Sequence, residues 1–387
     1  MGYLKFSADR IFTGNNWLGS DKVLVTDGKG VVEAIIESDE GGEDVKKLQG
    51  TLSPGLVNAH CHLELSHLKG RIAEHTGLVD FVLEILKLRN SATEDKVMQA
   101  IKDAEDEMIR NGIVAVGDIC NTSMTLKQKQ NNNLAYYNFI EGSGFIPSAA
   151  RDRMAIIQSV YNSFINDSPF ERSTTIVPHA PYSVSDELWQ LMKGFYQGKV
   201  VSLHSQESPD EGAFLKNATG DFLRLYKKLS ITIDSYKGSG CAGVEGYYSH
   251  LRGAENALLV HNTFIGAEDI RYLENEKANR PVLCCCINAN LYIEDTVPPM
   301  NQLADSGLTI VLGTDSLASN HSLSILAEMR SIRKHFPSIT FEQMLPWATK
   351  NGAEALMLQH KLGSFEKNKK PGVICITPGF EDVIKLI

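Results

Sequence analysis

The sequence predicts an α/β protein built as a TIM-like (β/α)8 barrel, in which eight parallel strands are surrounded by helices. First, eight apolar segments of strand length alternate with helix-like segments through the middle of the chain. Second, these segments are apolar on both faces, as expected for strands covered by helices outside and side chains inside. Third, polar residues stand at the ends of several segments. A doubly wound open sheet is the alternative, but no GxGxxG motif follows the first strand.

The predicted strands follow one another in chain order. They are GLVNAHCH (55–62), GIVAVGDI (112–119), LAYYNFIEG (134–142), TTIVPHAPYS (174–183), VVSLHSQES (200–208), ALLVHNTF (257–264), VLCCCINAN (282–290) and TIVLGTDS (309–316). Apolar residues at three- and four-residue spacing predict helices between most of them, at 78–90, 94–110, 151–165, 186–197, 322–335 and 341–357. The polar stretch 127–133 is predicted to be a solvated loop.

The two ends of the chain have a different pattern. Residues 1–50 contain short β-rich pieces separated by Gly and Asp turns, and KPGVICITPG (370–379) reads the same way. With 387 residues, the chain is long enough for a large domain and an accessory one.

Composition narrows the class of partner. The net charge of −9 is spread along the chain and argues against nucleic acid as the main partner. No apolar run could span a membrane, and the N-terminus lacks a signal-peptide pattern. The seven cysteines include no CxxC pair, so we expect free thiols in a reducing cytoplasm. We expect a soluble cytoplasmic protein that binds a small molecule. Its oligomeric state stays open, with a homodimer among the candidates.

Histidines and an aspartate at strand ends predict a metal site. The C-terminal ends of barrel strands converge on one mouth, where active sites lie. His60 and His62 are two residues apart on a strand and can therefore reach the same ion. His204 and Asp315 could complete a His3Asp shell that suits zinc or ferrous iron and leaves one position open for water. Any one of these residues could simply be a polar group at a core edge, but their combination favours the metal site.

The motifs around these residues resemble those of the metal-dependent amidohydrolase superfamily, specifically its mononuclear aminohydrolase branch. The resemblance covers essentially the whole chain and implies one divalent ion, zinc first and iron second, because no lysine bridging a second metal is apparent. It also implies a small composite β-sandwich domain from 1–50 and 365–387 beside a catalytic barrel at 51–364. The matching motifs are SPGLVNAHCHLELSHLKG (53–70), PHAPYSVSDEL (178–188), LHSQES (203–208), LLVHNTF (258–264) and VLGTDSLASNHSLSILAEMR (311–330).

Two segments depart from the family pattern. CCCINANLYI (284–293) replaces the commoner Cys-Pro-x-Ser-Asn of the seventh strand, and KKPGVICI (369–376) lacks the usual Ala-Asp. Neither change removes a predicted metal ligand. The first leaves open which groups line one wall of the pocket.

Three residues are expected to carry the chemistry. Glu207 follows His204 by three residues and could move a proton from water to a ring nitrogen. A non-ligand glutamate does this in zinc deaminases of unrelated fold. Asp315 could accept a hydrogen bond from the water, and His261 could orient that water or stabilise developing charge. Considered without its spacing from His204, Glu207 would be interpreted as a solvent-exposed acidic residue in a loop.

Other residues are candidates for contact with the substrate. The resemblance implies that His179 faces the substrate, the alternative being a plain turn histidine. Glu64 lies two residues beyond His62 and could point to the same mouth, or form a salt bridge with a neighbouring lysine or arginine. Arg151 or Arg153 could meet an anionic group, although surface charge at a helix start is the simpler interpretation. The polar segment 208–225 is long enough to cover the mouth.

The segment HCHLELS (60–66) is the most discriminating local feature. It resembles the aminodeoxyfutalosine deaminases, which implies deamination of an adenine-type purine nucleoside, first 6-aminodeoxyfutalosine in menaquinone biosynthesis. Adenosylhomocysteine, methylthioadenosine and adenosine are the related substrates. One alternative is a deaminase or chlorohydrolase acting on guanine, cytosine or a triazine. Another is a non-catalytic scaffold, which the complete set of ligands disfavours.

Overall fold

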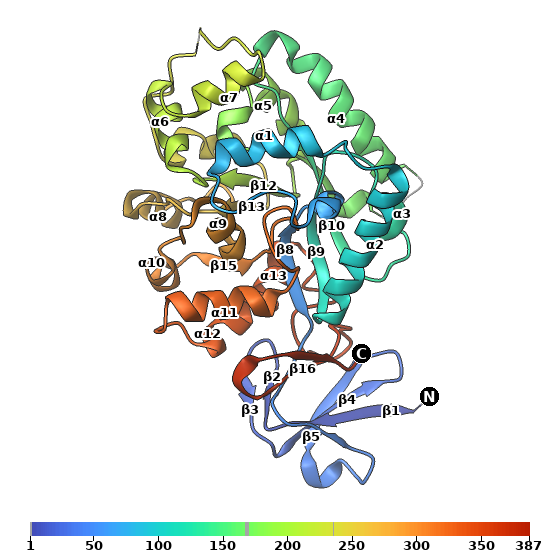
Figure 1. Ribbon diagram of the computed structural model, residues 1–387. Coiled ribbons are helices and arrows are strands. Elements are labelled where there is room, and N and C mark those ends of the chain that lie inside the picture. Colours follow the sequence, from blue (N-terminus) through green and yellow to red (C-terminus); the bar gives the residue numbers. More distant parts are fainter. Residues whose placement is uncertain (1, 167–169, 235) are drawn as a thin grey trace.

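A computed structural model of the chain describes residues 2–166, 170–234 and 236–387. The remaining positions, 1, 167–169 and 235, fall within the predicted domain ranges and lie outside the described residues. A large part with parallel strands and helices occupies one end of the molecule, and a smaller β part that holds both chain ends occupies the other (Figure 1).

All eight predicted strand segments overlap a strand of the large part, which confirms an α/β protein with parallel sheets. Consecutive strands pair in parallel within two four-stranded sheets. The first sheet contains β8 (Leu56–Cys61), β9 (Ile113–Cys120), β10 (Ala135–Gly142) and β11 (Thr174–Pro178). The second contains β12 (Val200–Ser205), β13 (Asn256–His261), β14 (Arg280–Cys285) and β15 (Thr309–Leu312).

Backbone hydrogen bonds join the two sheets at the C-terminal ends of their outer strands. The His204 N–H donates to the carbonyl of His179 at 2.9 Å, between β12 and the residue after β11. The Thr314 and Asp315 N–H groups donate to the carbonyl of His60 at 3.0 and 3.1 Å, which links the end of β15 to β8. Among the described residues, regular strand pairing does not cross these seams, so a closed barrel stays a prediction.

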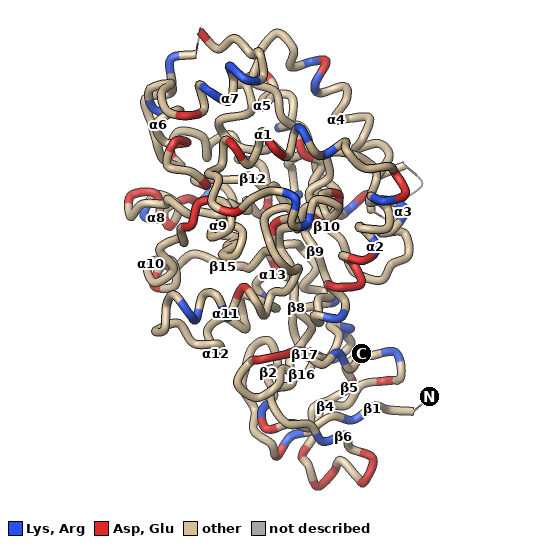
Figure 2. The backbone as a smooth tube through the Cα atoms, in the orientation of Figure 1, with Lys and Arg blue, Asp and Glu red and all other residues tan. Residues whose placement is uncertain are grey.

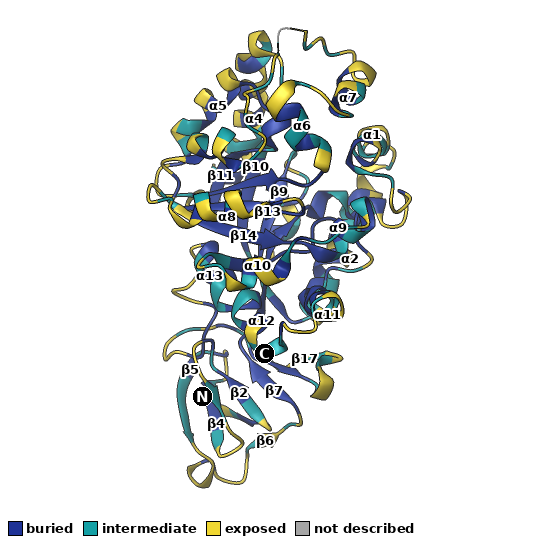
Figure 3. Ribbon diagram, turned by 90° about the vertical axis from the view of Figure 1, so that its left-hand side faces the viewer, coloured by how far each residue is buried: buried dark blue, intermediate teal, exposed yellow. Residues whose placement is uncertain are grey.

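Helices cover the strands and turn their polar faces outward, while the strands between them are almost wholly buried (Figure 3). Helix α2 shows why, because its buried Val97, Ile101, Ala104 and Met108 recur every three or four residues. The predicted helix at 341–357 is divided at Thr349 into two. The helices are α1 (Leu78–Leu88), α2 (Glu94–Arg110), α3 (Leu126–Lys129), α4 (Ala150–Ile165), α5 (Asp186–Met192), α6 (Pro209–Asn217), α7 (Phe222–Lys228), α8 (Ala267–Glu274), α9 (Ile287–Glu294), α10 (Met300–Asp305), α11 (Ile325–His335), α12 (Phe341–Ala348) and α13 (Lys350–Ala355).

The prediction of a solvated loop at 127–133 is wrong in its first half. Helix α3 includes Lys127 to Lys129, and the Lys129 side chain is fully buried. The Lys129 Nζ atom lies 2.5 Å from Asp118 Oδ2 and donates a hydrogen bond to Asn138 Oδ1 at 2.8 Å. A buried lysine is tolerated here because a carboxylate pairs with it.

The smaller β part consists of two sheets. One has the strand order β5-β4-β1-β6 and the other β17-β16-β7-β2-β3. Their strands are β1 (Tyr3–Ser7), β2 (Arg10–Phe12), β3 (Trp17–Leu18), β4 (Lys22–Asp27), β5 (Val32–Glu37), β6 (Lys46–Lys47), β7 (Thr51–Ser53), β16 (Ile374–Ile376) and β17 (Val383–Lys385). Both chain ends contribute to one apolar cluster, formed by Phe6, Ala8, Ile11, Leu24, Val32, Leu52, Phe365, Val373 and Cys375.

Strand β7 pairs with β2 and β16, so the sheet continues past residue 50, where the sequence placed the start of the barrel. The domain boundaries themselves stay a prediction. Basic and acidic residues are interspersed over both parts of the molecule (Figure 2). No described helix combines the length and the apolar character that crossing a bilayer would require. The seven cysteines, all of them described, are free thiols.

Candidate active site

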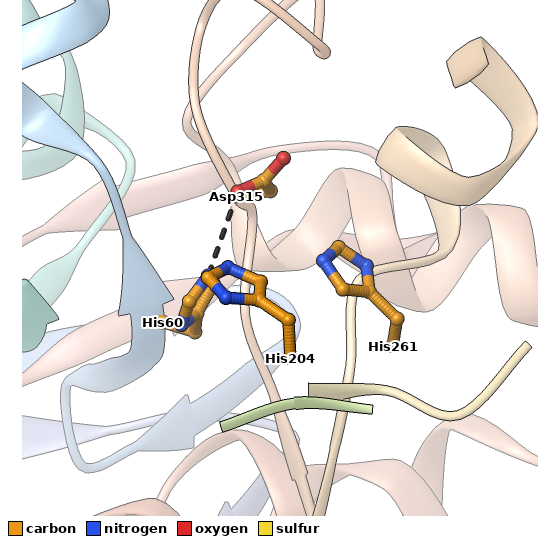
Figure 4. A group of neighbouring side chains, drawn as sticks. All are labelled: His60, His204, His261 and Asp315. Carbon is orange, nitrogen blue, oxygen red and sulfur yellow. Dashed lines mark ion pairs between the residues drawn. The ribbon is translucent and has the colours of Figure 1, made fainter. Parts of the chain in front are cut away.

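Five predicted side chains meet at the C-terminal ends of the parallel strands. His60 lies on β8, His204 on β12, and His261 is the last residue of β13. His62 is the residue directly after β8, and Asp315 is the third residue after β15. His60, His204, His261 and Asp315 point toward one another (Figure 4), and each offers a donor atom within 4.8 Å of the other three.

The spacing of four donor atoms fits one divalent ion. The Nε2 atom of His62 lies 3.1 Å from His60 Nε2, 3.2 Å from His204 Nε2 and 3.2 Å from Asp315 Oδ1. The His60 Nε2 atom lies 3.5 Å from the same carboxylate oxygen. Four ligands at about 2.0–2.1 Å from a tetrahedral ion are about 3.4 Å apart. The four predicted ligands are therefore together, with the spacing and donor types that a zinc-sized ion requires.

Neighbouring groups hold two of these ligands in orientation. The His204 Nδ1–H donates to the His179 carbonyl at 2.9 Å, which leaves the Nε2 lone pair facing the cluster. The Ser319 hydroxyl donates to Asp315 Oδ2, the carboxylate oxygen that does not face the histidines. Asp315 itself has a φ of +56°, in the left-handed region that L-residues rarely adopt. Such strain is common at active sites.

A buried acid lies beside this cluster. Glu207 follows β12, and its Oε1 atom is 3.5 Å from His261 Nε2. The other nitrogen of His261, Nδ1, donates to Asn290 Oδ1 at 2.8 Å. The chain segment after β12 is held by Glu211, whose carboxylate accepts hydrogen bonds from the backbone N–H groups of Gln206 and Glu207 at 3.0 and 3.2 Å. Burial raises the pKa of Glu207 well above its usual value, which suits a group that accepts and releases a proton.

The cluster opens into a cavity of about 450 Å³. Most of its wall is apolar, with contributions from α1, the segment after β10, and α7 with the residues that follow it. The segment 208–225, expected to cover the mouth, thus forms α6 and the start of α7, and Leu225 lines the cavity. The apolar lining comprises Leu65, Leu78, Phe81, Val82, Ile85, Leu86, Phe145, Ile146, Leu225, Leu229 and Ile231.

The predicted substrate residues differ in where they lie. His179 lines the cavity, and its Nδ1 atom is 2.8 Å from Ser183 Oγ. Glu64 is buried in a short 3-10 helix (Leu63–Leu68) and is not among the cavity-lining residues. Its Oε2 atom accepts hydrogen bonds from the N–H and hydroxyl of Thr122 at 3.0 and 2.8 Å. Its Oε1 atom lies 3.8 Å from Arg89 Nη2. The ion pair is therefore with Arg89, and not with Lys69 or Arg71, which are closer to Glu64 in the sequence.

Arginines supply the positive charge of the cavity. Arg151 is exposed on the first turn of α4 and does not line the cavity, whereas Arg153, two residues later, does. Arg89 lines it too, from the end of α1. Arg89 could not be predicted from the sequence, because only the packing of α1 brings it there. Glu141 and Asn121 also line the cavity. Their positions at or just after strand ends are the sequence signal that could have identified them.

Parallel strands that end in a His3Asp cluster beside a buried glutamate define a hydrolase with a metal site. The chain belongs to the Amidohydrolase family, whose family model matches residues 51–383. Family and site together make it an enzyme that hydrolyses carbon–nitrogen bonds.

Known proteins show how far the similarity extends. An adenosine deaminase from Helicobacter pylori is 25% identical over 328 residues, which cover 82% of this chain and 77% of that protein. The structure of H. pylori aminofutalosine deaminase in complex with methylthio-coformycin gives a TM-score of 0.80 at 22% identity and covers 99% of this chain and 93% of that one. An adenosine deaminase from Xanthomonas campestris with bound zinc gives 0.72 at 20%, covering 97% and 85%. At these identities the solved structures establish the shared fold.

Proposed function

We propose that this enzyme is a zinc-dependent deaminase of adenine-type purine nucleosides, with 6-aminodeoxyfutalosine of menaquinone biosynthesis as its substrate. The observation that carries the proposal is the position of Glu207, buried 3.5 Å from His261 beside the four metal ligands and lining an apolar cavity. The names of similar proteins, adenosine deaminase and aminofutalosine deaminase, support the adenine nucleoside, and the zinc in one of them supports the metal.

The residues divide the reaction among them. His60, His62, His204 and Asp315 would hold a divalent ion, which would lower the pKa of water so that it can react at neutral pH. Glu207 accepts a proton from this water and delivers it to N1 of the adenine ring, which makes C6 electrophilic. The water oxygen would bond to C6, its second proton would pass to the exocyclic nitrogen, and the C6–N6 bond would break to release ammonia as the C6 carbonyl forms. His261 directs Nε2 toward the reacting water, because Asn290 holds its Nδ1–H.

The lining of the rest of the cavity supports a substrate whose 5′ substituent is larger than the 5′-hydroxyl group of adenosine. Apolar side chains of α1 and α7 face the space beyond the metal ligands, and they suit an aromatic 5′ group. Arg89 and Arg153 line the same cavity, and a guanidinium suits the carboxylate of a benzoate. Arg153 forms no ion pair within the described part of the chain.

We also propose that the two parallel sheets close into a single (β/α)8 barrel. The hydrogen bonds at both seams and the likeness to solved structures of the family support closure. The β strands at the chain ends would then form a sandwich beside the barrel. A biosynthetic substrate of this kind would place the enzyme in the cytoplasm.

The proposed function is tested by ammonia release over a panel of substrates. The panel contains 6-aminodeoxyfutalosine, adenosylhomocysteine, methylthioadenosine, adenosine, guanine, cytosine and a triazine. We expect the highest kcat/KM for 6-aminodeoxyfutalosine and measurable turnover of the other adenine nucleosides. Guanine or a triazine as the best substrate would overturn the nucleoside assignment. A preference for adenosylhomocysteine would overturn the pathway and leave nucleoside deamination in place.

A further inference from the structure

Glu141, which the proposed reaction does not use, lines the cavity and has one carboxylate oxygen without a hydrogen-bond partner among the described residues. The residue lies near the end of β10 and lines the cavity, and its side chain is only 6% exposed. Its Oε2 atom accepts a hydrogen bond from Asn121 Nδ2 at 2.9 Å. Its Oε1 atom is buried and has no hydrogen-bond partner among the described residues. A buried acceptor without a partner is rare in folded proteins and calls for an explanation.

The adjacent histidines do not supply the missing partner. The His204 Nδ1 atom lies 3.5 Å from Glu141 Oε1, but its proton is donated to the His179 carbonyl at 2.9 Å. The His179 Nδ1 atom contacts the Ser183 hydroxyl at 2.8 Å. A cation held by Glu141 and both histidines would need His204 to give up the hydrogen bond that orients it toward the metal cluster. The unpaired oxygen is therefore better explained by a neutral donor that arrives with the substrate.

An adenine nucleoside carries few hydrogen-bond donors. The 6-amino group is one, and in the proposed reaction it lies at the metal ligands beside Glu207. The ring nitrogens of neutral adenine are acceptors and cannot bond to a carboxylate. The ribose hydroxyl groups are the donors that remain away from the reacting carbon.

We propose that Glu141, held by Asn121, is the residue that recognises a ribose hydroxyl of the substrate. This inference rests on the proposed function, and it identifies the ribose as the part of the substrate that contacts Glu141. The other acidic candidate for contact with the substrate, Glu64, already accepts two hydrogen bonds from Thr122 and is absent from the cavity lining. Glu141 lines the cavity and has an acceptor oxygen without a partner among the described residues, whereas Glu64 does not line the cavity.

The test compares adenosine with 2′-deoxyadenosine and 3′-deoxyadenosine. The wild-type enzyme should prefer adenosine over at least one deoxynucleoside by at least ~10-fold in kcat/KM, because the missing hydroxyl leaves a buried acceptor unpaired. Glu141→Ala should lower kcat/KM for adenosine by at least ~10-fold while changing that deoxynucleoside little, so the preference largely disappears. Glu141→Gln, which keeps one acceptor oxygen but loses the charge, should fall between the two.

Glu64→Gln is the matched control, since it removes the charge of a buried acid that bonds to Thr122, the residue after Asn121. It should affect the ribose and deoxyribose substrates equally. Metal content and melting temperature should stay near wild type in both Glu141 variants. An equal loss on all three nucleosides, or a loss of metal, would overturn the inference and make Glu141 a positioning residue for His204. Failure of the wild-type enzyme to act on any adenine nucleoside would instead overturn the proposed function from which the inference starts.

Discussion

The two nitrogens of His204 face in opposite directions, one toward the metal cluster and one toward the backbone. Nε2 lies 3.2 Å from His62 Nε2, and Nδ1 donates to the His179 carbonyl. Replacing His204 by alanine removes one of four ligands, so we predict that bound metal falls well below one ion per chain and that activity is lost. Elemental analysis of the purified protein measures this. The exposed His335 provides the control, and metal retained at full occupancy in His204→Ala would contradict the ligand assignment.

The proposed function of Glu207 is separable from metal binding. Its carboxylate faces His261 and the cavity and is not one of the four donor atoms of the cluster. Glu207→Gln keeps the shape and removes the proton acceptor, so we predict near-normal metal content with turnover reduced by at least ~10²-fold. Glu268→Gln, at a position whose side chain is 95% exposed, is the matched control for the same chemical change. Normal turnover in Glu207→Gln would mean that another group carries the proton.

Arg151 and Arg153 form a natural pair for testing where the substrate's anionic group lies. Only Arg153 lines the cavity, so Arg153→Ala should lower kcat/KM for 6-aminodeoxyfutalosine by about 10-fold or more, because the carboxylate loses a charged hydrogen-bond partner. The same change should affect adenosine much less, since adenosine lacks the carboxylate. Steady-state kinetics on both substrates measure the difference. A selective loss in Arg151→Ala in place of Arg153→Ala would assign this contact to Arg151.

At the scale of elements, α3 is fixed by a charge inside the protein. The Lys129 Nζ atom pairs with Asp118 on β9, and Asp118 Oδ1 also accepts the N–H of Leu63, the residue after the metal ligand His62. Lys129→Met would leave Asp118 buried without its partner, so we predict a loss of about 3–5 kcal/mol in the free energy of unfolding. Urea unfolding measures it. Lys127→Met, two residues earlier and exposed, should change stability by about 0.5 kcal/mol or less.

The same element shows what the sequence could and could not reveal. Strands were predictable because runs such as LVNAHC are buried along their whole length, which is the pattern of a parallel strand. The burial of Lys129 was not predictable, because its partner Asp118 lies on a separate element and a polar stretch normally faces water. The expected direction of Glu64 failed for a local reason. The chain turns into a 3-10 helix at Leu63, so strand alternation no longer applies.

The clustering of the proposed metal ligands was predictable for a related reason. His60 and His62 share one short motif, and His204 and Asp315 stand where parallel strands end, so strand order alone brings them together. The residues that shape the rest of the cavity come from helices. Arg89 and the apolar side chains of α1 reach the cavity only through the packing of that helix, which a single sequence does not specify.

At the scale of the whole molecule, the chain ends meet in one sheet. Cys375 on β16 pairs with Leu52 on β7, and both belong to the apolar cluster of the β part. The β-rich character of both ends was readable from their turns and short apolar pieces. Their pairing across more than 300 residues of sequence was expected only from the family resemblance, because strand register over such a distance leaves no local pattern.

The proposed metal ligands are divided between the two parallel sheets of the large part. His60 belongs to the first sheet, whereas His204 belongs to the second and Asp315 follows the second sheet's last strand. An ion bound by all of them would join the sheets near the seams, where the described backbone hydrogen bonds are few. Bound metal should therefore contribute to the stability of the whole part as well as to catalysis.

Removal of the metal should consequently lower the melting temperature. A ligand present at 1,000 times its Kd stabilises the folded state by about 4 kcal/mol, which corresponds to a change in Tm on the order of 5–10 °C for a large domain. We predict a decrease of this size when a chelator is added to the wild-type protein, and recovery when zinc is restored. Differential scanning calorimetry measures both. His204→Ala should melt at the lower temperature from the start and should respond little to the chelator. An equal response of variant and wild type would show that the stabilising ion is bound elsewhere.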